Sequence, residues 1–220
     1  MAVRAAQEQD SAVAAELVFS SGPVAFEHIF NCTHGPNIRE FLDSEFAKLA
    51  TMFSHRHHFV CEQDGRLIAT IGGFDKASHD ATFMGNAKAI FTQYGWRGIV
   101  KGLLFELRLV KPPRKGCYYL CHIAVDPQWR GKGIAAQLIN FMAARAQELG
   151  YSTLSLDVAE LNVGALRLYQ QLGFKVIKRN KSYNLSLIPI LRWHTKRNVS
   201  TKVLDEEYTL RKHKKTDEKE

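Results

Sequence analysis

A glycine-rich turn in the second half of the chain carries the residues best suited to chemistry. The run Ile123–Ala135 has the pattern of an apolar strand, a turn with Gly131 and Gly133, and the start of a helix. The unpaired N–H groups of a first helical turn converge on one point, where the helix dipole adds partial positive charge. Arg130 and Lys132 add further positive charge. The run predicts an anion site that a pyrophosphate would fit, unless it is only a tight connection between strand and helix.

Two common phosphate-binding motifs do not describe this turn. It lacks the Gly-Lys-Ser/Thr ending of a Walker A motif, and Ala136 stands where a dinucleotide-binding fingerprint has its third glycine. A second block at a fixed distance downstream is more informative. It consists of Leu156–Asn162, Ala165, Leu168, Tyr169 and Leu172–Phe174.

The turn and this block together resemble the GNAT superfamily of acyl-CoA-dependent N-acetyltransferases. The family's Q/R-x-x-G-x-G/A signature stands here as Gln128–Gly133, and its N-x-x-A-x-x-L-Y-x-x-x-G-F signature is complete from Asn162 to Phe174. The resemblance is specific from Tyr118 to about Ile177 and extends to the first half only in layout. It implies an α/β (α+β) fold, with a mixed central sheet flanked by helices and two splayed central strands.

The resemblance also implies where acetyl-CoA would bind. In the family, the strand that matches Ile123–Val125 splays from its neighbour, and its free backbone groups hold the pantetheine arm and stabilise the oxyanion. Asn162 matches the residue that holds the pantetheine amide, although it could equally be the N-cap of a helix from Val163. The implied acetyl-CoA ligands are Ile123, Ala124, Val125, Gln128, Arg130, Gly131, Lys132, Gly133, Ile134, Ala135 and Asn162.

Transfer to an amine needs an acid and a base. Tyr169 matches the family's general acid, since a phenol pKa near 10 is close to that of the departing thiolate; its alternative role is a packed aromatic on an amphipathic helix. For the base, Asp157 falls where ribosomal-protein alanine acetyltransferases carry a Glu, one methylene longer. His122 titrates in the right range and is its rival, or else simply packs in its strand. Glu160 is a third candidate, and the sequence leaves the choice open.

The elements that must position these residues begin with an antiparallel first half. We expect a strand over Val3–Ala5, a helix over Ala12–Val18 capped by Asp10 or Ser11, and an amphipathic helix from Asn37 to about Phe53. Two β-rich runs then flank the hairpin signal Asp64-Gly65. A mixed, partly helical excursion follows at about 75–115, and the run His55–His58 reads as a solvated turn.

The second half alternates strands and helices. The expected elements are a strand (Tyr118–Val125), a helix (Gly133–Leu149), a strand (Thr153–Val158), a helix (Val163–Leu172), a strand from Lys175, and a further strand at Tyr183–Leu187 that ends by Pro189 near the sheet edge. Residues 1–210 are thus expected to form one domain, and the charged stretch 211–220 a solvated tail.

Composition limits the remaining possibilities. The 220 residues carry a net charge of +8, which suggests a polyanionic partner and suits CoA. The first residues lack the pattern of a signal peptide, no apolar stretch is long enough to span a membrane and no Cys spacing is of a metal type. We therefore expect a cytoplasmic protein without a signal peptide or a metal and with reduced thiols. No nucleic-acid module is recognisable. A homodimer is compatible with the chain.

The resulting hypothesis is an acetyl-CoA-dependent N-acetyltransferase that passes the acetyl group directly to a primary amine of a small molecule. No cysteine is placed to act as a nucleophile, and the long excursion could close over the acceptor. The alternative acceptor is a protein N-terminal amine or a lysine, as suggested by the position of Asp157.

Overall fold

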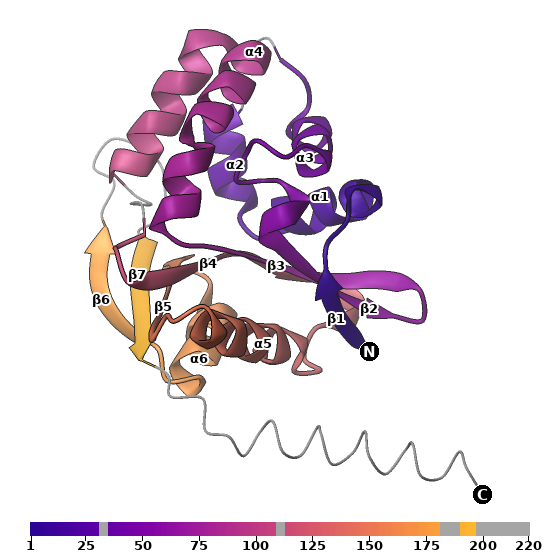
Figure 1. Cartoon of the computed structure of the whole chain (residues 1–220), viewed down its shortest axis with the longest axis vertical. Coiled ribbons are helices and arrows are strands. Elements are labelled where there is room, and N and C mark those ends of the chain that lie inside the picture. The colour runs from indigo at the N-terminus through magenta and orange to yellow at the C-terminus, as the bar shows by residue number, and fades with distance from the viewer. Residues whose placement is uncertain (31–34, 109–112, 181–189, 197–220) are drawn as a thin grey trace, which may run out of the picture.

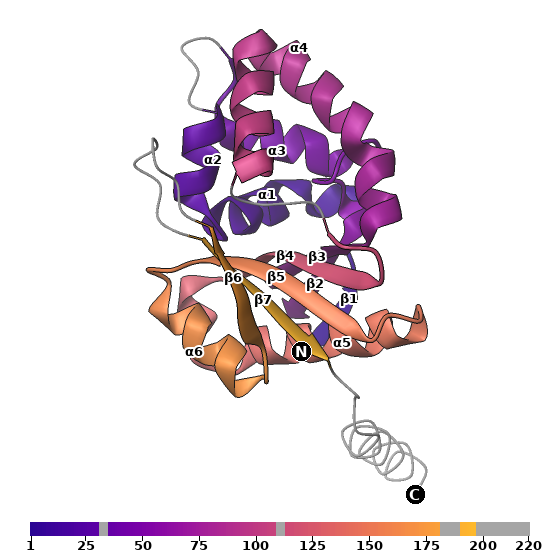
Figure 2. The same ribbon diagram turned by 90° about the vertical axis from the view of Figure 1, so that its left-hand side faces the viewer.

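The computed structural model describes residues 1–30, 35–108, 113–180 and 190–196, and it places one seven-stranded sheet at the centre of the molecule. The strand order is β1-β2-β3-β4-β5-β7-β6. Helices α1 to α4 cover one face of the sheet, and α5 and α6 cover the other (Figures 1 and 2). This mixed, mainly antiparallel sheet between two helical layers confirms the expected α/β fold.

The antiparallel first half forms as predicted. Strand β1 (Ala2–Ala5) pairs with β2 (His58–Gln63), which pairs in turn with β3 (Arg66–Phe74). The two-residue turn has φ of 51° at Asp64 and 75° at Gly65. Positive φ at both positions gives the turn the twist of the strands that it joins, which is why Asp-Gly predicts a hairpin.

The helices of the first half differ in detail from the prediction. Helix α1 (Ser11–Ser20) follows Asp10, whose carboxylate binds Arg4 and the Gln7 amide instead of capping the helix. Pro23 also begins a helix that the sequence did not predict, α2 (Pro23–Phe30). Helix α3 (Ile38–Ala47) ends earlier than expected. The Met52 amide donates to Asn86 on the fourth helix, so a tertiary contact replaces the last helical turn.

Most of the described part of the excursion is helical. Helix α4 (Lys76–Arg108) bends at Gly95, where φ is 63° and ψ is −165°. Because glycine adopts these angles without steric cost, the chain turns there and continues as helix. The two arms of α4 stand above the sheet beside α2 and α3 (Figures 1 and 2).

The second half follows the predicted alternation up to its last strand. The elements are β4 (Cys117–Val125), α5 (Ile134–Glu148), β5 (Thr153–Ala159), α6 (Val163–Gln171), β6 (Lys175–Asn180) and β7 (Ile190–Lys196). The expected strand Tyr183–Leu187 and the tail 211–220 lie outside the described residues. Strand β7 begins just after Pro189 and inserts between β5 and β6, so an interior strand starts where we expected one to end at an edge.

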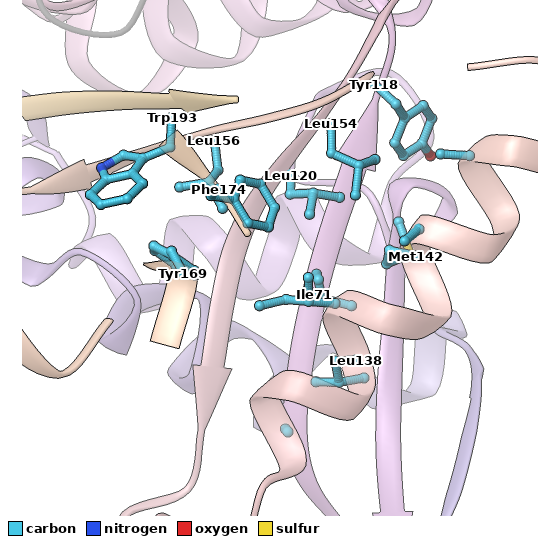
Figure 3. Close-up of a cluster of buried hydrophobic side chains, with 14 of the residues drawn as sticks. Ile71, Tyr118, Leu120, Leu138, Met142, Leu154, Leu156, Tyr169, Phe174 and Trp193 are labelled. Atoms are coloured by element: carbon cyan, nitrogen blue, oxygen red, sulfur yellow. The ribbon is translucent and has the colours of Figure 1, made fainter. Parts of the chain in front are cut away.

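Two apolar cores hold the layers together. The core under α5 and α6 includes Leu120, Leu156 and Trp193, and Figure 3 shows these side chains together with Leu138 and Met142 of α5. The second core lies on the opposite face among α1 to α4 and is rich in phenylalanine. Because the sheet separates the cores, side chains that alternate along β4 and β5 enter one or the other.

Candidate functional site

Strands β4 and β5 separate in the middle of the sheet. Their parallel pairing runs from Cys117–Thr153 to Leu120–Leu156 and ends there, although both strands continue. In the same part of β4, His122 and Ile123 together oppose the single residue Ile71 of β3, which is a β-bulge. His122 has a φ of 49° at this bulge. The splayed strands implied by the sequence are therefore present, and the bulge is the local feature that redirects β4.

The glycine turn follows the splayed end of β4 directly. Gly131 and Gly133 have φ of 76° and 77°, angles that L-residues rarely adopt. No atom lies within 4 Å of a Cβ built at either position, so the backbone is open on the side where a side chain would be. Gly133 is the N-cap of α5 and provides no side-chain acceptor. The amides of the first turn therefore have no side-chain cap from this residue, and the anion site at this turn stays a prediction.

The basic residues of the turn are held by local contacts. The Arg130 Nε donates to the Val125 carbonyl at 3.1 Å, and the Lys132 Nζ lies 4.3 Å from the centre of the Trp129 ring. Both positive charges therefore stay at the turn. Gln128 begins the signature in a short 3₁₀ helix whose first amides are capped by Asp126.

Asn162 occupies the N-cap of α6, the structural role that the sequence left open. Its Oδ1 accepts a hydrogen bond from the Ala165 amide at 3.1 Å. The side-chain NH₂ remains a donor, and the residue is exposed. The cap therefore fixes the orientation of the side-chain amide and does not use its NH₂ group.

Tyr169 lies on α6 and packs in the core beneath the sheet. Its ring centre is 5.8 Å from that of Phe174 and 6.4 Å from that of Trp193 (Figure 3). Within the described residues its hydroxyl has no hydrogen-bond partner. Burial raises its pKa well above 10, so the group stays protonated at working pH but is a weaker acid than the sequence argument assumed.

Asp157 is fully engaged in a buried ion pair on the opposite face. Its oxygens accept from Arg192 Nε at 2.9 Å and from Arg192 Nη2 at 2.6 Å, and the Tyr119 hydroxyl donates to it at 3.2 Å. The Asp157 side chain is only 3% exposed. Glu160 is likewise paired, with Arg179, but near the surface. Both carboxylates thus have structural partners, and neither Arg192 nor Arg179 was singled out from the sequence.

His122 is the remaining candidate base, and the residue as a whole has intermediate burial. It stacks on Phe53 at 5.7 Å, and its Nδ1 lies 2.9 Å from Nε2 of His58. Burial, and second the nearby His58, lower the pKa of His122 well below 6.5, so the ring is neutral. His58 itself is buried, which corrects the expectation that His55–His58 is a solvated turn. The alternation of the strand could have indicated that His58 is buried, because the apolar Val60 lies on the same face.

The described part of the chain holds no group of three metal-ligating side chains, and no helix in it is long and apolar enough to cross a membrane. Cys61, Cys117 and Cys121 are free thiols.

Comparison with known proteins agrees with this geometry. The acetyltransferase (GNAT) family matches residues 24–174, more than half of the chain, which therefore belongs to that family. Crystal structures share its fold: one acetyltransferase superposes with a TM-score of 0.65 at 20% identity, covering 89% of this chain and 99% of the other. A Drosophila melanogaster polyamine N-acetyltransferase gives 0.55 at 19% identity, covering 89% and 99%.

Curated relatives match in shorter segments. N-acetyltransferase 8B of Homo sapiens is 43% identical over 56 residues, which are 26% of this chain and 25% of that protein. An Escherichia coli [ribosomal protein bS18]-alanine N-acetyltransferase is 36% identical over 63 residues, 28% of this chain and 43% of the relative. N-alpha-acetyltransferase MAK3 of Arabidopsis thaliana is 24% identical over 176 residues, 76% and 75% of the two chains. The chain spans only 25% and 40% of the length of two N-acetyltransferase 8 relatives.

Proposed function

We propose that this protein transfers the acetyl group of acetyl-CoA directly to a primary amine of a small molecule. The observation that carries the proposal is the end of the β4–β5 ladder at Leu120, which precedes an open glycine turn on the same strand. A free strand edge suits an extended amide-containing arm, and the turn suits a pyrophosphate. The net charge of +8 favours such a polyanion.

The donor would be held mainly by backbone. The N–H groups of Ile123–Val125 would bind the arm and stabilise negative charge on the thioester oxygen during attack, while the turn amides of residues 131–135 would bind the pyrophosphate. The Asn162 NH₂ is the donor left for an amide of the arm. When bound, acetyl-CoA supplies an activated acetyl group and a thiolate leaving group.

His122 is the proposed base. Its Nε2 has no hydrogen-bond partner within the described residues, and His122 lies on the splayed part of β4. The attacking amine loses a proton to this nitrogen as its own basicity falls during bond formation. Asp157 is less suited, because accepting a proton would break its ion pair with Arg192.

Tyr169 is the proposed acid. Its hydroxyl is protonated and has no partner among the described residues, so it can donate to the departing sulfur without first losing a hydrogen bond to any of them. A covalent enzyme intermediate is not needed. Burial raises the pKa of the Cys121 thiol far above its ordinary value, so the cysteine beside His122 offers no thiolate nucleophile.

The proposed acceptor is small because helices cover the face that carries His122. Helices α2, α3 and α4 stand above that face, and Phe26 of α2 lies 6.0 Å from the His122 ring centre. An amine must therefore approach beneath helices, as a small molecule can. A protein N-terminal amine is the second candidate, favoured by the alanine N-acetyltransferase and N-alpha-acetyltransferase relatives.

The test is thiol release by the purified protein with acetyl-CoA and two acceptor panels, polyamines and arylalkylamines against peptides that begin with alanine. We expect turnover of small amines, and a loss of roughly 10²- to 10⁴-fold in kcat for His122→Gln, with unchanged acetyl-CoA binding by calorimetry. Turnover of peptides alone would establish the second candidate. A folded protein that does not bind acetyl-CoA would overturn both.

A further inference from the structure

A second histidine reaches the proposed base across a neighbouring strand. His58 lies on β2 and His122 on β4, with β3 between them. The two rings are nearly parallel, with an interplanar angle of 4° and centres 5.1 Å apart. His58 is only 1% exposed, and its other nitrogen, Nδ1, lies 2.8 Å from the Ser54 carbonyl. Both nitrogens of His58 are thus in contact with fixed partners.

Gly72 on β3 provides the space for this contact. It pairs with His58 on one side and with Cys121 on the other. A Cβ at this position would lie 2.9 Å from His58 Nε2 and 2.8 Å from Cys121 Sγ, both too close. Gly72 does not have a positive φ, so its backbone conformation does not itself require glycine. The missing side chain instead lets the His58 ring pass over β3 toward β4.

The hydrogen-bond chain determines where the protons lie. The Ser54 carbonyl can only accept, so His58 Nδ1 carries a proton and donates it. Burial lowers the pKa of His58 to about 4, so its ring is neutral and Nε2 has a lone pair. His122 Nδ1 must then be the donor at 2.9 Å. In a neutral imidazole the remaining nitrogen, Nε2 of His122, is unprotonated and free to accept a proton.

We propose that His58 is the positioning residue of the acetyl-transfer reaction: it accepts the Nδ1 proton of His122 and holds that ring with its unprotonated Nε2 directed away from the pair. This inference rests on the proposed function of His122 as the base. When Nε2 takes the proton of the amine, the imidazolium keeps its Nδ1 hydrogen bond to His58, which stabilises the new charge. The proton remains on His122 until solvent removes it, and His58 stays neutral throughout.

The tautomers can be observed without any activity assay. In the ¹⁵N spectrum of the full-length protein at pH 7, protonated and unprotonated imidazole nitrogens have separate shifts. We expect both histidines to show a protonated Nδ1 and an unprotonated Nε2, with assignment by the variants His122→Gln and His58→Gln. A protonated Nε2 on His122 would overturn the proposal, whatever the protein acetylates.

Kinetics of matched variants test the effect on the reaction. His58→Gln keeps an acceptor near the Nε2 position, whereas His58→Leu has none. We expect kcat of the Leu variant to fall roughly tenfold or more, while the KM for acetyl-CoA is unchanged. This loss is a part of the full contribution that a positioned base makes to kcat. The Gln variant should stay within about threefold of the parent protein, as should His57→Gln, whose ring is not part of the pair.

The outcomes separate the two proposals. If His122→Gln retains full activity, His122 is not the base, even when the tautomers are as expected. If His122→Gln is inactive but the folded His58→Leu variant has normal kcat and an unchanged pH profile, His122 is the base and His58 does not position it. Should His58→Leu fail to fold, the ¹⁵N spectrum of the parent protein still decides the tautomer.

Discussion

Asp157 and His122 differ in the interactions that each would lose on accepting a proton. The carboxylate of Asp157 accepts two bonds from Arg192 and one from Tyr119, so protonation removes a buried ion pair. The Nε2 of His122 has no such partner within the described residues. The same type of comparison separates a structural charge from a reactive group wherever both lie near a candidate site.

Removing the Asp157 charge should therefore affect stability more than catalysis. We expect Asp157→Asn to lower the free energy of unfolding by roughly 3–5 kcal/mol, because it removes one charge of a buried ion pair. Glu160→Gln is the matched control. The side chains of Glu160 and Arg179 are 30% and 51% exposed, so this substitution should lower the unfolding free energy by less than about 1 kcal/mol. Urea unfolding measures both. A normally stable Asp157→Asn variant with kcat reduced more than about a hundredfold would make Asp157 the base.

Tyr169 presents the opposite case, a buried hydroxyl whose removal breaks no hydrogen bond within the part of the chain that the structure describes. Tyr169→Phe should keep the packing against Phe174 and Trp193 and leave the unfolding free energy within about 0.5 kcal/mol of the parent. Its kcat should fall by roughly 10²- to 10⁴-fold, since the sulfur loses its proton donor. Stopped-flow and steady-state measurements of thiol release would test this prediction. Unchanged turnover would leave Tyr169 only its packing role.

At the scale of elements, the proposed function depends on a strand that stops pairing and on a turn whose two glycines leave its backbone open. The bulge at His122 and Ile123 bends β4 away from β5 just where the ladder ends. The turn at Gly131 and Gly133 then leads into α5 with its first amides open. Strand and turn are consecutive, so one continuous segment can hold both ends of a long ligand.

A methyl group in this turn should interfere with the ligand and not only with the backbone. Gly133→Ala places a side chain at φ of 77° and should cost about 1–2 kcal/mol of stability. Gly65→Ala in the β2–β3 hairpin has nearly the same φ, 75°, and the same open surroundings, so it should cost the same. Only Gly133→Ala should weaken acetyl-CoA binding, which calorimetry would measure. Equal affinities in the two variants would remove the turn from the donor site.

At the scale of the whole molecule, the sheet separates two cores that carry the two proposed proton-transfer groups. Tyr169 belongs to the core under α5 and α6, whereas the His122 ring contacts Phe26 and Phe53 of the opposite core. The splay between β4 and β5 is the place where the sheet no longer separates these layers. An acid and a base on opposite sides of one opening suit a reaction in which the nucleophile loses a proton and the leaving group gains one at the same carbonyl carbon.

The buried histidines should also make folding stability depend on pH. The pKa of His58 is about 4 in the folded chain against 6.5 ordinarily, so between these values the unfolded state binds more protons. The contribution of neutral His58 to the free energy of unfolding is therefore fully present above pH 6.5. It is lost as the pH drops toward 4, and the loss amounts to about 3 kcal/mol. His122 on β4 and His57 on the preceding turn, whose pKa values burial also lowers, act in the same direction.

Urea unfolding between pH 4.5 and 7.5 would measure this dependence. His58→Gln removes the titrating group while keeping a polar side chain at the same position, so its stability should fall less steeply toward acid pH. Among the described residues, the ionisable groups around His58 include His55 and His57 before it, His122 across β3, and the Cys121 thiol. Parallel curves for the parent and the variant would mean that His58 is not neutral and buried in the folded protein.

Much of the site could be predicted because it is local in sequence. The Asp64-Gly65 hairpin, the glycine turn and the Asn162 cap each depend on a few consecutive residues whose backbone preferences are intrinsic. The regular strands and helices of the second half follow for the same reason, from their own periodicity.

The rest depends on contacts between distant segments, which only the tertiary structure decides. The sequence left Asp157 and His122 equivalent, because nothing near either of them indicates the partners Arg192 and His58. Those partners meet through strand order and register: β7 inserts beside β5, and Gly72 opens a path from β2 to β4. The residue types of the candidate site could therefore be identified from the sequence, whereas the folded sheet determines their protonation states.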